Sequence, residues 1–107
     1  MPLKEAVREL ETLLDDERHR GQFDWAARTC ELCRDVMHHV VLAPLSRTEI
    51  EGAIELFERA LSHMDPDDPQ IGLRHKNVAL RIRNLRHLLR GEPPEITEPE
   101  PRDSVHV

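Results

Sequence analysis

Two cysteines and a histidine lie at spacings that metal sites use. Cys30 and Cys33 are one helical turn apart, and His38 follows them in the same predicted helix. Zinc prefers four thiolate or imidazole ligands in a tetrahedron, so a fourth ligand would have to come from another part of the chain. The alternative is that both cysteines pack as small hydrophobic residues on the apolar face of the helix. We favour packing in the core, and we expect no metal and no other cofactor.

Two arginines precede histidines at a short, fixed spacing. Arg34 and His39 enclose four residues, and Arg81 and His87 enclose five. This spacing resembles that of the HEPN ribonucleases, which are helical bundles of about this size. The resemblance implies an arginine that holds phosphate and a histidine that acts as general acid or base in RNA cleavage. Asp35 departs from the pattern, because its carboxylate would repel a phosphate beside Arg34. We therefore expect no enzyme activity and keep the ribonuclease as an alternative.

The segment from 70 to 90 is basic along its length and contains no acidic residue. One interpretation is a basic ridge that binds an acidic peptide or nucleic acid. The other, which we favour, is that acids of neighbouring helices neutralise these cations. If a partner binds here, its expected contact residues are Arg74, Lys76, Arg81, Arg83, Arg86, His87 and Arg90, together with Trp25. For Trp25 the alternative is packing at a helix corner.

Composition and charge narrow the class of protein. The chain has 107 residues and a formal net charge of −6, and no strand-like alternation of apolar residues occurs in it. This favours one all-α domain and disfavours general attraction to nucleic acid or to anionic lipid. The N-terminus does not resemble a signal peptide, and no apolar run approaches the roughly 20 residues of a membrane span. Two cysteines in such a chain are typical of the cytosol, so we expect a cytoplasmic protein.

Two helices are predicted in the first half of the chain, from apolar residues that repeat with helical period. The first should start at Pro2, end at about 19–20 and be followed by Gly21 in a left-handed conformation. The second should take Asp24 as its N-cap and end before Pro44, because the residue ahead of a proline avoids helical geometry.

Two further helices are predicted over 46–64 and 70–90. Ser46 and Glu49 form a capping box at the start of the third helix, and Gly91 ends the fourth. The links between the four helices are short, which predicts antiparallel neighbours. We expect an all-α domain of four antiparallel helices, packed either as a bundle or as stacked helical hairpins.

The last part of the chain is rich in proline and glutamate. Such a sequence cannot bury enough apolar surface to offset the entropy lost on ordering. We therefore expect a helical domain over 1–91 and a disordered acidic tail over 92–107. The tail could fold back over the basic ridge of the fourth helix.

Small, apolar and aromatic residues recur at a spacing that resembles the tetratricopeptide repeat. The residues that carry the resemblance are Leu10, Leu13, Gly21, Phe23, Ala26, Cys30, Cys33, Ala53, Phe57 and Ala60. The chain departs from the repeat because only residues 42–45 separate the second and third helices, so one expected helix is missing. The resemblance implies a scaffold that binds a protein or peptide and has no catalytic role.

These patterns together predict an adaptor or regulator. We expect a protein or peptide partner on the surface of the second and fourth helices, and a homodimer is as well supported as a monomer. The alternative is a nucleic-acid-directed protein, either a binder or a ribonuclease, that uses the basic helix over 70–90 or the pair Arg34 and His39.

Overall fold

Four helices form the described part of the protein. The computed structural model describes residues 2–42 and 45–93. The helices are α1 (Leu3–Leu14), α2 (Phe23–Leu42), α3 (Arg47–Leu61) and α4 (Gly72–Leu89). No strand occurs within these residues, and the predicted all-α fold is confirmed. The predicted disordered tail lies, from residue 94 onward, outside the described residues.

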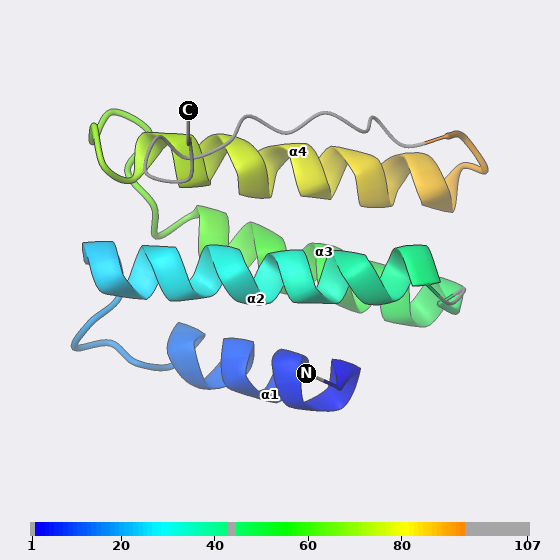
Figure 1. Ribbon diagram of the computed structural model, residues 1–107, viewed down its shortest axis with the longest axis horizontal. Helices are drawn as coiled ribbons and strands as arrows, with labels where there is room; N and C mark the ends of the chain where they lie inside the picture. Colours follow the sequence, from blue (N-terminus) through cyan, green and yellow to red (C-terminus); the bar gives the residue numbers. More distant parts are fainter. Residues whose placement is uncertain (1, 43–44, 94–107) are drawn as a thin grey trace, which may run out of the picture.

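The helices are arranged as two stacked hairpins. Successive helices run antiparallel, so α1 and α2 form one hairpin while α3 and α4 form the second (Figure 1). The most extensive helix contacts lie within each hairpin. Between the hairpins, α2 packs against α4 and α1 packs against α3, and the helices of each of these pairs are parallel (Figure 1). Of the two predicted architectures, the structure has the stacked hairpins.

The hydrophobic core forms where the apolar faces of all four helices meet. The predicted capping box starts α3: the amide of Glu49 donates to Ser46 Oγ (3.1 Å), and the amide of Ser46 donates to the Glu49 carboxylate (2.9 Å). Apolar residues follow the capping box with helical period, and five of them are buried, namely Ile50, Ala53, Ile54, Phe57 and Ala60. Apolar residues also repeat with helical period in and just before α4, and of these Ile71, Val78, Ile82 and Leu85 are buried.

The first helix ends earlier than the sequence predicts. α1 stops at Leu14, and the amides of His19 and Arg20 donate to the carbonyl of Asp16 in a separate turn. The Asp16 carboxylate also pairs with His19 Nδ1 (2.8 Å), which lowers the pKa of that carboxyl. Aspartate competes for local hydrogen bonds in this way and is a poor helix-interior residue. Gly21 is left-handed as expected, with φ +85°, but it precedes α2 and does not cap α1.

The second helix begins slightly earlier than predicted. α2 starts at Phe23, so Asp24 lies in its first turn and is not the N-cap. The amide of Ala26 donates to the carbonyl of Gln22 (2.9 Å), which begins the helical hydrogen bonding. A carboxylate in the first turn still interacts favourably with the helix dipole.

The turn before α4 delays the start of that helix to Gly72. The Asp68 carboxylate accepts the amides of Gln70 (2.7 Å) and Ile71 (3.2 Å), so these two residues belong to the turn. A Cβ at position 72 would lie 2.8 Å from the carbonyl oxygen of Pro66, closer than side chains pack, which explains the glycine.

The two hairpin turns lie side by side at one end of the molecule, at the left of Figure 1. There the indole of Trp25 donates to the carbonyl of Leu13 (2.7 Å), and its ring meets His63 edge-on at 6.2 Å between centroids. The guanidinium of Arg74 lies over the ring of Phe23, 4.9 Å from its centroid. These contacts join the hairpins at this end.

Candidate functional site

The cysteines lie in the core, as the packing interpretation predicts. Cys30 and Cys33 are buried free thiols within the hydrophobic cluster, while His38 is exposed on α2. Among residues 2–42 and 45–93, no group of three or more histidine, cysteine or acidic side chains is placed to hold a metal ion. Cys30 instead contacts Arg81, whose Nη1 lies 3.3 Å from its sulfur and donates to its carbonyl oxygen (2.8 Å).

Arg81 is a correction to the predicted contact surface, because it is completely buried. Asn77 and Asn84 lie one turn before and one turn after it on the same face of α4, and both are also buried. We use the name α2–α4 seam for the region that contains Cys30 of α2 and Arg81, Asn77 and Asn84 of α4. A guanidinium held in the seam cannot reach a partner, and it cannot hold phosphate for His87.

Trp25 is the second correction to the predicted contact surface. Its side chain is 3% exposed and packs between the two hairpin turns, so it acts as a corner residue. Its exposed neighbour is Phe23, which is 40% exposed under the guanidinium of Arg74.

Several remaining basic residues of α4 contact the protein itself. Arg86 pairs with Glu58 of α3, and Arg90 pairs with Glu92 at 2.9 Å, which lowers the pKa of the Glu92 carboxyl. His87 Nδ1 lies 3.1 Å from the carbonyl oxygen of Pro93. The pair of Arg86 with Glu58 is the kind of neutralisation that the sequence favoured. Whether the exposed residues of α4 contact a partner stays a prediction.

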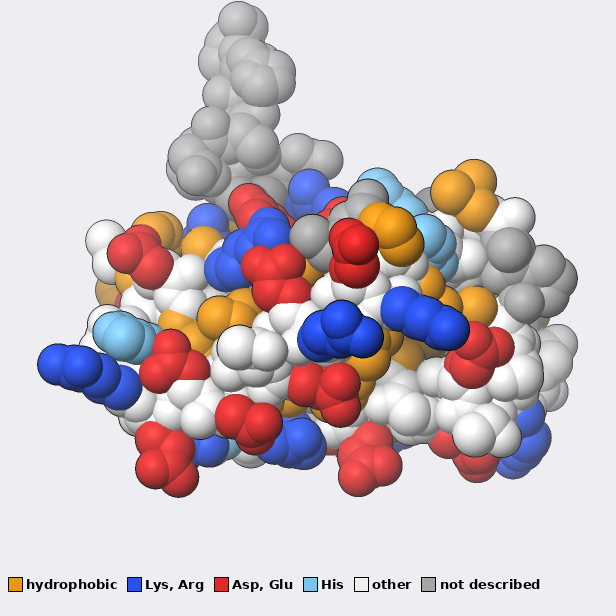
Figure 2. Space-filling view, turned by 90° about the horizontal axis from the view of Figure 1, so that it is seen from below, with side chains coloured by type: hydrophobic (Ala, Val, Ile, Leu, Met, Phe, Trp, Pro, Cys, Tyr) orange, Lys and Arg blue, Asp and Glu red, His pale blue; other side chains and the backbone are white. Residues whose placement is uncertain are grey.

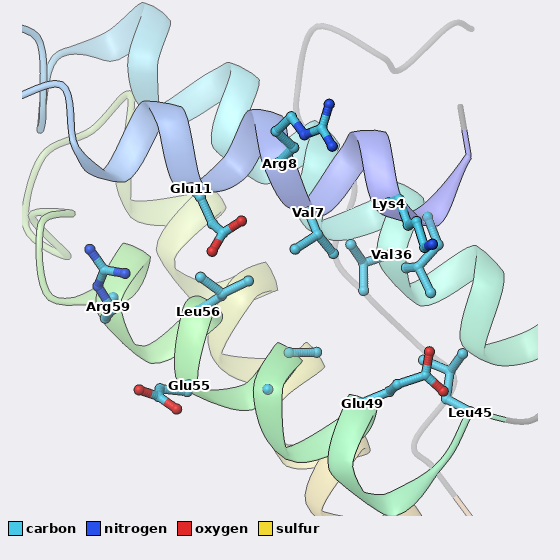
Figure 3. A pocket seen from close by; sticks show the side chains of 13 residues that line it. Lys4, Val7, Arg8, Glu11, Val36, Leu45, Glu49, Glu55, Leu56 and Arg59 are labelled. Atoms are coloured by element: carbon cyan, nitrogen blue, oxygen red, sulfur yellow. The ribbon is translucent and has the colours of Figure 1, made fainter.

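An apolar groove lies between α1 and α3. It has a volume of about 560 Å³ and separates these helices along much of their length. Figure 3 shows Val7 of α1 and Leu56 of α3 on opposite walls of the groove, with Val36 of α2 beside Val7. We call this space the α1–α3 groove; its apolar lining is Leu3, Val7, Val36, Leu45, Ala53 and Leu56.

Charged residues border the groove along both helices. Near the start of the helices Lys4 faces Glu49, and near their ends Glu11 faces the side of Arg59 (Figure 3). Seen from the α1 side, hydrophobic side chains are exposed between lysine or arginine and acidic side chains (Figure 2). The groove therefore has an apolar floor and charged edges, the usual anatomy of a protein-binding patch.

The middle of the groove is flanked by opposite charges. Arg8 lies on the outer edge of α1 and Glu55 on the outer edge of α3 (Figure 3). No ion pair involves Lys4, Arg8, Glu11 or Glu55 in the part of the chain that the structure describes. By contrast, Arg28 on the outside of the first hairpin pairs with Glu9 at 2.6 Å. These four charged groups at the groove are thus left to solvent or to another molecule, whereas Arg59 at its end pairs with Asp15 (3.5 Å).

A glycine lowers the α3 wall of the groove. Gly52 lies in the middle of α3 and lines the groove, and a Cβ there would have no atom within 4 Å. Glycine in a helix interior is less stable than alanine by about 0.5–1 kcal/mol. No close contact in the described structure requires glycine at this position. The sequence prediction missed this groove, although a glycine inside the strongest helical pattern was a signal for it.

A second, shallower groove lies between α3 and α4. Its lining includes Leu61, Ala79 and Ile82, and the pair of Arg86 with Glu58 lies at its border. It has less exposed apolar surface than the α1–α3 groove, so it is the weaker candidate.

No family model, curated protein or solved structure matches this chain. The resemblances to tetratricopeptide repeats and to HEPN ribonucleases therefore rest on the quoted residues alone. None of the described helices has the length and apolar character needed to cross a membrane.

Proposed function

We propose that this protein is a non-catalytic interaction module, an adaptor or regulator, and that it binds a protein partner in the α1–α3 groove. The observation that carries the proposal is an open apolar groove, bordered by four charged residues that form no ion pair within the described residues, namely Lys4, Arg8, Glu11 and Glu55. The predicted surface was that of α2 and α4, but Arg81 and Trp25 of that surface are buried. The proposed docking surface therefore lies on α1 and α3 instead of α2 and α4.

The groove offers a partner both affinity and specificity. Val7 and Leu56 are half-buried, so covering them removes further apolar area from water, at about 25 cal/mol per Å². Arg8 and Glu55 at the edges then select among apolar partners by charge.

Binding of nucleic acid is the competing class of function, and the structure weakens its basis. Arg86 and Arg90 already lie against carboxylates, and Arg81 is inside the core. A phosphate backbone would have to displace Glu58 and Glu92 from these arginines. Such binding would also weaken steeply with added salt, whereas a mainly apolar contact would not.

Affinity capture from the organism that makes this protein tests the proposal, with a groove variant and a matched control. Leu56→Glu places a charge in the groove, while Leu42→Glu makes the same change at a site that is 82% exposed and outside the groove. We expect the wild type and Leu42→Glu to retain the same protein after nuclease treatment and in high salt, and Leu56→Glu to lose it. Capture that survives Leu56→Glu, or that disappears with nuclease, would contradict the proposal.

A further inference from the structure

The shape of the α1–α3 groove fits a single helix. Its walls are two parallel helices, and the lining from Leu3 to Glu11 spans roughly 12 Å of helix axis, or two to three turns. A helix satisfies its own backbone hydrogen bonds, so it can lie against the apolar side chains of Val7 and Leu56. An extended peptide would leave amides and carbonyls facing these side chains without partners.

Gly52 adds a reason for a close approach at the α3 wall. The absent side chain leaves the backbone of α3 exposed to the groove, next to Ala53. Small residues let two helices approach closely, within the usual interaxial range of about 8–10 Å. Gly52 makes α3 less stable than alanine would, and no contact within the described structure offsets this loss. Packing of a partner helix against Gly52 would offset it.

The edges of the groove fix the charges of such a helix. The α1 edge carries Lys4, Arg8 and Glu11, and the α3 edge carries Glu49, Glu55 and Arg59. The formal charge of these side chains is +1 on the α1 edge and −1 on the α3 edge. Glu49 stays ionised through the capping box, because the amide of Ser46 donates to its carboxylate and lowers the pKa. The two edges therefore attract opposite charges.

We infer that the occupant is one amphipathic helix of the partner protein, with acidic residues on the flank along α1 and basic residues on the flank along α3. This inference rests on the proposed function and names its partner class. Turning a helix end for end in the groove exchanges its two flanks. The charges of Arg8 and Glu55 therefore set the direction in which a given partner helix lies.

A second copy of this chain is a poorer occupant. Its α1 and α3 would present the same hollow surface, and two facing hollows leave their apolar floors apart, so Val7 and Leu56 of neither copy would be covered. A stable interface needs close packing of its core.

Two labelled helical peptides of about 14 residues, each about four turns long, test the inference by fluorescence anisotropy at low salt. Both carry the same leucine stripe at helical spacing. The first has glutamates on one flank and lysines on the other, and the second has lysines on both flanks. We expect the wild type to bind the first peptide more tightly, by roughly fivefold, because one flank of the second meets Arg8. Leu56→Glu should weaken binding of the first peptide by more than about tenfold.

A charge reversal on the protein makes the test specific. Arg8→Glu gives both edges of the groove the same sign, so it should invert the preference and favour the peptide with two lysine flanks. Arg18→Glu makes the same change at an exposed residue outside the groove and should leave the preference unchanged. Equal effects of the two reversals would show that only net charge matters and would overturn the inference.

The outcomes also separate the inference from the proposed function. If neither peptide binds, while capture of the native partner still depends on Leu56, the helix inference fails and the proposed function stands. If capture is independent of Leu56 as well, both fail. Sedimentation that shows a dimer of the wild type and a monomer of Leu56→Glu would assign the groove to a second copy and would also overturn the inference.

Discussion

The α2–α4 seam and the α1–α3 groove are the two places where parallel helices of the stacked hairpins lie side by side, yet the seam is closed and the groove is open. In each, a helix of the first hairpin runs parallel to a helix of the second (Figure 1). The seam encloses the whole side chain of Arg81, and its guanidinium reaches the carbonyl of Cys30 on the other helix. The groove leaves Val7 and Leu56 partly exposed to solvent.

Side-chain size accounts for much of the difference. In the seam, the long side chain of Arg81 and its neighbours Asn77 and Asn84 fill the space between helices. At the groove, α3 presents Gly52 and Ala53, and even a Cβ added at Gly52 would meet no atom within 4 Å. The comparison shows that one stacking of hairpins gives either a closed contact or an open site, depending on a few residues.

The largest expected effect is that of Arg81→Ala, which tests whether the seam is closed. It should lower the free energy of unfolding by about 3 kcal/mol or more, because it leaves a cavity and removes the hydrogen bond to Cys30. Urea unfolding followed by circular dichroism measures this. Lys76→Ala on the exposed side of α4 is the matched control and should change stability by less than about 0.5 kcal/mol. Equal effects of the two changes would mean that the seam is not a closed contact.

The next effect concerns the α3 wall of the groove. Ser46→Ala removes one half of the capping box and should cost about 1 kcal/mol. Because the capping box lies at the exposed start of α3, hydrogen exchange should become faster in the first turn of α3 and stay unchanged in the seam around Arg81. Faster exchange in the seam would show that the two regions are not independent.

A smaller change of opposite sign is expected at the floor of the groove. Gly52→Ala should raise the free energy of unfolding by about 0.5–1 kcal/mol, since alanine is the better helix former and its Cβ would meet no atom within 4 Å. Thermal unfolding would detect the gain. A loss of stability would mean that the position is packed, which would remove the contrast with the seam.

The smallest effect is a pH dependence at the start of α3. The amide and hydroxyl of Ser46 lower the pKa of Glu49 in the folded protein, so its stabilisation is complete above the ordinary glutamate pKa. It is lost as the pH falls through the lowered folded value. Glu49→Gln should remove this part of the pH dependence, so urea unfolding of wild type and variant should differ near neutral pH and converge in acid. Parallel dependence of the free energy of unfolding on pH in the two proteins would contradict this prediction.

Periodicity predicted the four helices, the capping box at Ser46 and the buried face of α3, because these depend on neighbours in the sequence. It did not predict which helices face one another, and both the seam and the groove depend on that. Arg81 lies one turn from both Val78 and Leu85, a spacing that puts it on their buried face. Its charge led to the prediction of an exposed residue, since burying a cation is costly without a partner. That partner, the carbonyl of Cys30, is 51 residues away in the sequence.

The guanidinium in the seam also restricts how the protein can deform. Sliding α2 past α4 by one residue would carry the carbonyl of Cys30 away from Arg81 and break a buried hydrogen bond to a charged group. The bond between Arg81 and Cys30 therefore fixes the register of α2 against α4, and with it the alignment of the two hairpins.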